Sequence, residues 1–191
     1  MPARQRTATA AWPETLWTIG HSTRSLEEFI ALLTRNRIEA LADVRHFPGS
    51  RKYPHFNVEP LRDAVQQAGI TYVPFTELGG RRKVAPDSPN TAWRHPAFRG
   101  YADYMATDAF HAGITRLKTL AIQKHTAIMC AEAVWWRCHR GLISDVFKLN
   151  GTRVLHIMGP GEPREHPYTS AAHAVDGHLD YSADQHQLPL T

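Results

Sequence analysis

The sequence lacks long apolar runs and contains very little cysteine. No run approaches the roughly 18 apolar residues that a membrane-spanning helix needs, and residues 1–17 lack the continuous apolar segment of a secretory signal. We therefore expect a cytoplasmic protein with no membrane partner. Two cysteines are too few for a disulfide framework, so free thiols, metal ligands or redox partners are expected instead.

Charged and aromatic residues are also not abundant. They make up 21% and 9% of the 191 residues, beside 42% hydrophobic residues, which is ordinary usage for one globular domain and excludes a disordered or fibrous protein. Lys and Arg number 22 against 18 Asp and Glu, and the isoelectric point is near 9.3. This excess permits an anionic partner, either a small molecule or a nucleic acid, and leaves the oligomeric state open.

Hydrophobic periodicity predicts alternating strands and helices. Ser25 and Glu28 form the sequence pattern of a capping box ahead of a helix. Strands are expected at residues 16–21, 40–47, 71–75, 125–132 and 153–158, and helices at 26–33, 57–70, 97–123 (with a break near 107–108) and 138–151. This alternation is typical of an α/β fold, here a single three-layer domain with a mostly parallel sheet of about five strands.

The two ends of the sequence differ from its middle. We expect a flexible basic N-terminal tail at residues 1–13, an α/β domain at 14–159, and a C-terminal extension at 160–191 that packs over the domain and is partly flexible. The histidines of this extension either cover the functional site or lie at the surface.

Polar residues follow each predicted strand. In a parallel α/β sheet, ligand-binding groups lie beyond the carboxyl ends of the strands. The residues placed there are His21, Ser22, Asp43, Arg45, Glu77, Gly79 to Arg82, Cys130 and Glu132.

Several segments occur in the order and approximate spacing of a known family. They include TIGHSTRSLEEFIALL, DVRHFPGSRKYPHFN, LGGRR, YADYM and MCAEAVWWRCHRGLISDVF, and they extend from about Leu16 to Tyr181. The polypeptide resembles the bacterial and archaeal family catalogued as domain of unknown function 488, and its CAE…CHR signature is specific. The resemblance implies an α/β fold and a shared polar site, and it implies no particular reaction.

Cys138, His139 and Arg140 fall at the predicted start of a helix, where backbone N–H groups and neighbouring cations stabilise a thiolate. Cys138 or Cys130 is therefore a candidate nucleophile or redox thiol, with His139 beside it, although either cysteine can equally be a small buried hydrophobic residue. The phosphatase pattern of a cysteine, five residues and an arginine is absent, because the sixth residue after each cysteine is Trp136 or Ser144.

A metal site is an alternative use of the same residues. Cys130, Cys138 and His139 offer thiolate and imidazole ligands, but their spacing matches no zinc motif. We therefore predict no cofactor, and keep a metal ion as the alternative.

Substrate-binding candidates are mostly basic or aromatic. His21, Ser22, Asp43, Arg45, Arg51, Arg140 and Trp136 are the candidates. Arginine suits phosphate groups, and an exposed tryptophan suits a base. An equally good interpretation of Asp43 and Arg45 is that they pair with each other, and Arg81 is solvated unless it joins the same groove.

Glu132 is the candidate general acid or base, since neighbouring tryptophans would desolvate it and raise its pKa, although Arg137 or Arg140 can equally hold it ionised as a structural partner. Together these residues predict an enzyme, a hydrolase or transferase, that acts on a phosphate-bearing substrate such as a nucleotide or nucleic acid. The alternatives are a non-catalytic nucleic-acid-binding module and a metal-dependent enzyme with Cys and His ligands.

Overall fold

A parallel sheet forms the centre of the molecule. The computed structural model describes residues 11–183. Six strands lie in the order β3-β2-β4-β1-β5-β6, and all neighbouring strands are parallel except β6, which runs antiparallel to β5. The predicted α/β fold with three layers is confirmed, and the five predicted strands are joined by a short sixth at the edge.

The elements of the sheet and its helices alternate along the chain. The strands are β1 Thr15–Gly20, β2 Ala40–Asp43, β3 Thr71–Pro74, β4 Thr126–Cys130, β5 Arg153–Ile157 and β6 Arg164–Glu165. The helices are α1 Leu26–Arg35, α2 Val58–Gln67, α3 Pro96–Tyr104, α4 Asp108–Gln123 and α5 Arg140–Leu149, with short 3-10 turns η1 Pro54–Phe56, η2 Thr76–Leu78 and η3 Trp135–Arg137.

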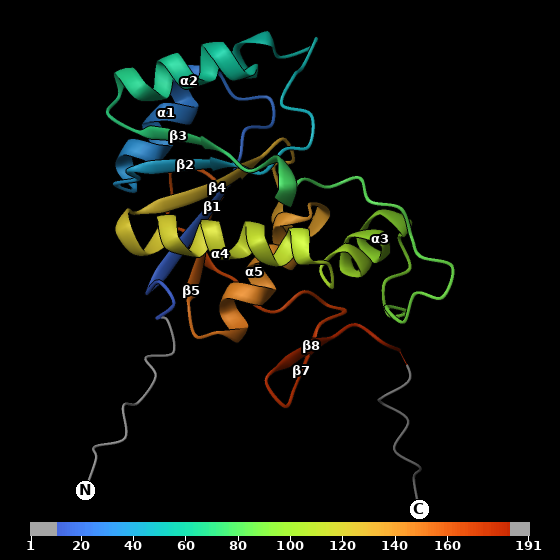
Figure 1. The fold of residues 1–191 in the computed structure, drawn as a ribbon. Helices are drawn as coiled ribbons and strands as arrows, with labels where there is room; N and C mark the ends of the chain where they lie inside the picture. The colour runs from blue at the N-terminus through green and yellow to red at the C-terminus, as the bar shows by residue number, and fades with distance from the viewer. Residues whose placement is uncertain (1–10, 184–191) are drawn as a thin grey trace, which may run out of the picture.

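Alternate residues of each strand face opposite layers of helices. One core cluster joins Ala127 and Met129 of β4 to α1 and α2, whereas the other joins Ile128 and Cys130 to α4 and α5. Figure 1 shows α1 and α2 on one side of the sheet and α4 and α5 on the other. The face that carries Cys130 is therefore the face covered by α5.

Local signals in the sequence set the helix ends. The Ser25 hydroxyl accepts from the Glu28 N–H and the Glu28 carboxylate accepts from the Ser25 N–H, so the predicted capping box is confirmed. The predicted break between α3 and α4 is also confirmed, because the Thr107 side chain caps α4.

The C-terminal part of the described chain runs over α5. Residues 160–183 contribute β6 and a hairpin of β7 His173–Val175 and β8 His178–Asp180, which Figure 1 shows beside α5. Ala171 and Tyr181 are buried against the core. The expected tail residues 1–10 and the last residues, 184–191, lie outside the described part of the chain. Within residues 11–183, no helix combines the length and apolarity needed to cross a membrane.

The neighbouring strands β1 and β4 are followed by connections that run in opposite directions across the sheet. After β1 the chain passes over one face to β2 and β3, and after β4 it passes over the opposite face to β5. A crevice at such a reversal, beyond the carboxyl ends of the strands, is where ligands bind in open α/β sheets. Cys130 ends β4 at this position.

Candidate functional site

The two cysteines come together beyond the end of β4. Cys130 is the last residue of that strand, and the loop that follows folds through η3 to bring Cys138 back just before α5. Both thiols are free, and Cys130 and Cys138 are 8% and 4% exposed. The two sulfur atoms lie within 4.8 Å of each other. The structure thus pairs the two residues that the sequence places eight positions apart.

His139 and Arg140 both contact the Cys138 sulfur. The sulfur lies 3.8 Å from His139 Nδ1 and accepts from Arg140 Nε at 3.4 Å. Arg140 also donates to the Thr18 hydroxyl and to the Glu132 carbonyl, at 3.2 and 2.6 Å. Its guanidinium is therefore held at three points, with one of its N–H groups aimed at the sulfur.

These contacts separate the acidities of the two thiols. Burial alone would raise the pKa of Cys138, but the hydrogen bond from Cys130 and the charges of Arg140 and His139 lower it well below its ordinary value. The pKa of Cys130 is raised well above its ordinary value, by its hydrogen bond to Cys138 and by burial. Cys138 is therefore the thiolate of the pair.

The same residues can hold a metal ion. The two sulfur atoms and one ring nitrogen of His139 lie within 4.8 Å of one another. His139 Nε2 lies 2.9 Å from the Val44 carbonyl oxygen, which can only accept, so Nε2 carries a proton in either charge state, and the neutral ring presents the lone pair of Nδ1 to the sulfurs. Tetrahedral zinc would place sulfur and nitrogen about 3.5 Å apart, close to the 3.8 Å between Cys138 and His139.

Three adjoining hollows form a cleft over the cysteine pair. Their volumes are about 640, 370 and 190 Å³, and Arg81 and Glu132 line all three. Lys52 and Arg137 add exposed cations, whereas Glu132 is the one carboxylate among the described residues that line the hollows. We call this feature the basic cleft, and it offers an anion several cations beside a thiolate.

Two of the four described non-glycine residues with positive φ line the basic cleft, and the other two, Arg37 and Asp176, lie outside it. Ser22 and Arg81 have φ angles of 50° and 61°, in the left-handed region that non-glycine residues rarely adopt. Gly80 lies so close to His139 that an added Cβ would be 3.0 Å from Nδ1. Strained backbone of this kind is typical of functional sites.

Asp43 and Arg45 pair with each other, as the second interpretation of the sequence had it. Arg45 donates to both carboxylate oxygens of Asp43 and to the Phe56 carbonyl, and the Tyr72 hydroxyl donates to Asp43 at 2.6 Å. Both side chains are at most 5% exposed. Arg45 lines the cleft with its charge already neutralised.

Glu132 is exposed, contrary to the expected desolvation by tryptophan. The reason is the geometry of η3, which stacks the Trp135 ring on His156 at a centroid distance of 4.7 Å and leaves Trp136 51% exposed. Neither ring lines the basic cleft.

The structure gathers most, but not all, of the candidate residues. Those that line the basic cleft are His21, Ser22, Arg45, Cys130, Glu132, Cys138 and His139. Arg51 and Trp136 are exposed outside it, and Asp43 and Arg140 are buried beneath it. Sequence reasoning missed the buried partners Thr18, Asp145 and His156, although an aspartate on the apolar face of α5 was a usable signal.

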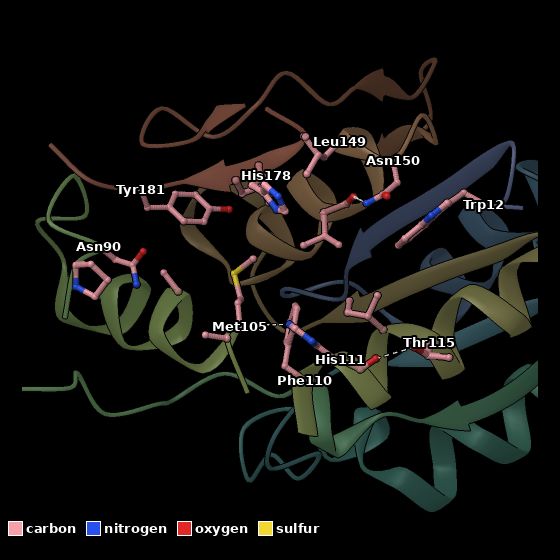
Figure 2. Close-up of a pocket in the computed structure, with 17 residues that line it drawn as sticks. Trp12, Asn90, Met105, Phe110, His111, Thr115, Leu149, Asn150, His178 and Tyr181 are labelled. Carbon is pink, nitrogen blue, oxygen red and sulfur yellow. Dashed lines mark hydrogen bonds between the residues drawn. The ribbon is translucent and has the colours of Figure 1, made fainter. Parts of the chain in front are cut away.

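A separate cavity of about 590 Å³ lies between α3, α4, α5 and the β7–β8 hairpin. Figure 2 shows Met105, Phe110 and Tyr181 among the side chains around it. The cavity shares no lining residue with the basic cleft, and none of its lining residues is acidic, basic (other than histidine) or cysteine. It lacks the nucleophiles and cations that the basic cleft provides.

Comparison with known families finds one match. The model of a domain of unknown function, DUF488, matches residues 25–147. The chain belongs to the DUF488 family. The resemblance seen in the sequence is thereby confirmed, and the DUF488 match contains both cysteines and Glu132. No curated protein and no solved structure matches the chain.

Proposed function

We propose that this protein is an enzyme that uses the Cys138 thiolate on a phosphate-bearing substrate, a nucleotide or nucleic-acid strand, bound in the basic cleft. The observation that carries the proposal is the placement of Arg140 and His139 on the Cys138 sulfur, at the edge of the sheet where the winding reverses. A thiolate stabilised in this way is a nucleophile at neutral pH.

The lining of the cleft supports an anionic substrate that carries a base. Lys52, Arg81 and Arg137 supply positive charge that Glu132 only partly offsets. Phe47, 64% exposed, and Tyr53 line the largest hollow and offer ring faces to a base. Arg81 lies over the Phe47 ring at 5.7 Å, which combines the two kinds of contact.

The reaction class is a hydrolase or transferase. The sulfur lone pair of Cys138 forms a bond to the electrophilic centre, and the leaving group departs with its bonding electrons and takes a proton from water. Water or an acceptor then gives a proton to the Glu132 carboxylate, which lines the same cleft, as it attacks the covalent intermediate and restores the thiolate; Glu132 returns that proton to the hydroxide left by the first step.

The test is alkylation of the wild-type protein by iodoacetamide, with mass spectrometry to separate the two cysteines. We expect Cys138 to react well below the pH at which an ordinary thiol reacts, and inorganic phosphate, a mononucleotide or a short oligonucleotide to slow the reaction. Arg137→Met should weaken this protection, whereas Arg62→Met, an exposed arginine on α2 outside the cleft, should not. A Cys138 that reacts like an ordinary thiol, or that no anion protects, would contradict the proposal.

A metal-dependent enzyme is the second candidate, and the orientation of His139 is the observation that favours it. Its Nε2–H is bonded to Val44, so Nδ1 would be available to hold a metal ion together with the two cysteine sulfurs, and the metal would supply a Lewis acid beside the cleft. Elemental analysis of protein purified without chelator separates the candidates. One equivalent of metal, with both thiols protected from alkylation until a chelator is added, would replace the free-thiolate mechanism.

A further inference from the structure

A line of buried hydrogen bonds leads away from Arg140 into the core. Arg140 Nη1 donates to the Thr18 hydroxyl, which lies 2.7 Å from His156 Nδ1. His156 Nε2 lies 2.9 Å from His166 Nδ1, and His166 Nε2 lies 2.9 Å from Asp145 Oδ1. We call these five residues the buried relay. Each of them is at most 1% exposed.

The buried relay lies between the sheet and α5. Thr18 of β1 and His156 of β5 are paired positions on adjacent strands, and Asp145 lies on the buried face of α5. His166 comes from the segment directly after β6, whose backbone N–H bonds the Val154 carbonyl. Four separate parts of the polypeptide therefore meet in this one network. The Trp135 ring covers it, stacked on His156 with an interplanar angle of 7°.

With both histidines neutral, chemistry fixes the direction of every hydrogen bond in the relay. A carboxylate only accepts, so Asp145 requires the proton of His166 to be on Nε2. His166 Nδ1 then accepts from His156 Nε2–H, and His156 Nδ1 accepts from the Thr18 hydroxyl. Thr18 is left with its oxygen to accept from Arg140, which only donates.

The neutral state of His156 agrees with this direction. Burial, and then the nearby His166 and Arg140, lower the pKa of His156 to about 2. Asp145 is also held from its other side, by the Thr169 N–H and hydroxyl and by the Tyr181 hydroxyl, at 2.8, 2.6 and 2.9 Å. The acceptor end of the relay is thus fixed independently of the cysteine pair.

We infer that Asp145 is a positioning residue for the Cys138 thiolate, acting through His166, His156 and Thr18 on the guanidinium of Arg140. This inference rests on the proposed function, because it concerns the same thiolate. Asp145 touches neither sulfur. Its effect is to fix the tautomers of both histidines, so that the Thr18 oxygen accepts from Nη1 and Nε remains aimed at Cys138.

The sign of the effect distinguishes positioning from the electric field of the carboxylate. Removing a negative charge from the interior would by itself favour a thiolate and lower the pKa of Cys138. Loss of the relay would instead let Arg140 leave the sulfur and raise that pKa. The titratable and charged groups nearest Cys138 are Cys130 of β4, Tyr101 of α3, His139 directly before α5, and Arg140 of α5. None of these changes in the variants below.

The experiment measures the pH dependence of Cys138 alkylation in full-length wild-type protein and in Asp145→Asn and Thr18→Val. Tyr181→Phe is the matched control, since it removes one hydrogen bond to Asp145 outside the relay. We expect both relay variants to move the profile to higher pH, with the rate at pH 6 falling about tenfold for each pH unit that the profile moves. Tyr181→Phe should stay within about twofold of wild type, a margin below a third of a pH unit. Circular dichroism and thermal melting verify that each variant is folded.

A second readout does not depend on the thiol. Nitrogen-15 NMR of the wild-type histidines should show His156 and His166 neutral at pH 7, each with its proton on Nε2. The opposite tautomer on either ring overturns the inference, even if Asp145→Asn does not fold. Folded relay variants with an unchanged profile, or one moved to lower pH, overturn it while the proposed function stands. An ordinary Cys138 in the wild-type protein overturns both.

Discussion

Gly20 is the position at which a single methyl group should displace the candidate site. This residue ends β1, and a Cβ added to it would lie 1.8 Å from the Glu132 carbonyl oxygen and 2.7 Å from the carbonyl carbon. Ordinary contact begins at 3.4 Å, so the backbone of Glu132 would have to move by about 1.6 Å. The Arg140 guanidinium donates to that same carbonyl at 2.6 Å, and so its contact with Cys138 would be disturbed as well.

We expect Gly20→Ala to lower the free energy of unfolding by about 1–3 kcal/mol, the usual cost of overpacking a rigid site. Urea unfolding measures this loss, and iodoacetamide alkylation should show slower reaction of Cys138 near neutral pH. The matched control is Gly159→Ala, because an added Cβ meets nothing within 4 Å there. A Gly20→Ala protein as stable and as reactive as the control would refute the close approach of Gly20 and Glu132.

Two further predictions concern buried charge and acid stability. Arg45→Met should cost about 3–5 kcal/mol in urea unfolding, because it leaves the Asp43 carboxylate buried without its partner; a change below about 0.5 kcal/mol would contradict that pairing. Burial is the main cause that lowers the pKa of His21 to about 4 and of His156 to about 2, so below about pH 6.5 the unfolded state binds more protons than the folded state. The free energy of unfolding should therefore fall as the pH is lowered, by up to about 1.4 kcal/mol per pH unit for each histidine, a contribution that ends near pH 4 for His21. Urea titrations between pH 7.5 and 4.5 measure the slope, and His21→Gln should flatten it; an equal slope in that variant would count against the burial argument.

The sequence predicted the main elements because their signals are local. Hydrophobic period, the capping box at Ser25 and the break before α4 each depend on residues within one or two turns. The order of the strands was not predictable in this way, because it depends on which faces pack together after the whole chain has formed. The edge strand β6, two residues long, carries no period at all.

The candidate site was predicted as a set of residues rather than as an arrangement. The strand-end rule placed Cys130 and Glu132 together, the predicted helix start placed Cys138 and His139, and all four line one hollow of the basic cleft. It could not show that Arg45 is neutralised by Asp43, since both interpretations fit the same spacing. The buried relay was not predicted, because its members are distant from one another in sequence. Only Asp145, an acid on the buried face of α5, departs from the hydrophobic period of its own helix.

The position of the relay has a practical consequence for anyone who shortens this chain. The DUF488 match runs from residue 25 to residue 147, so it includes Asp145 but neither Thr18 nor His156. A fragment cut at those limits would lose β1, which lies between β4 and β5 inside the sheet, and would keep an aspartate whose described partners had all been removed. The smallest piece that retains this architecture therefore extends beyond the family match at both ends, from β1 through Tyr181.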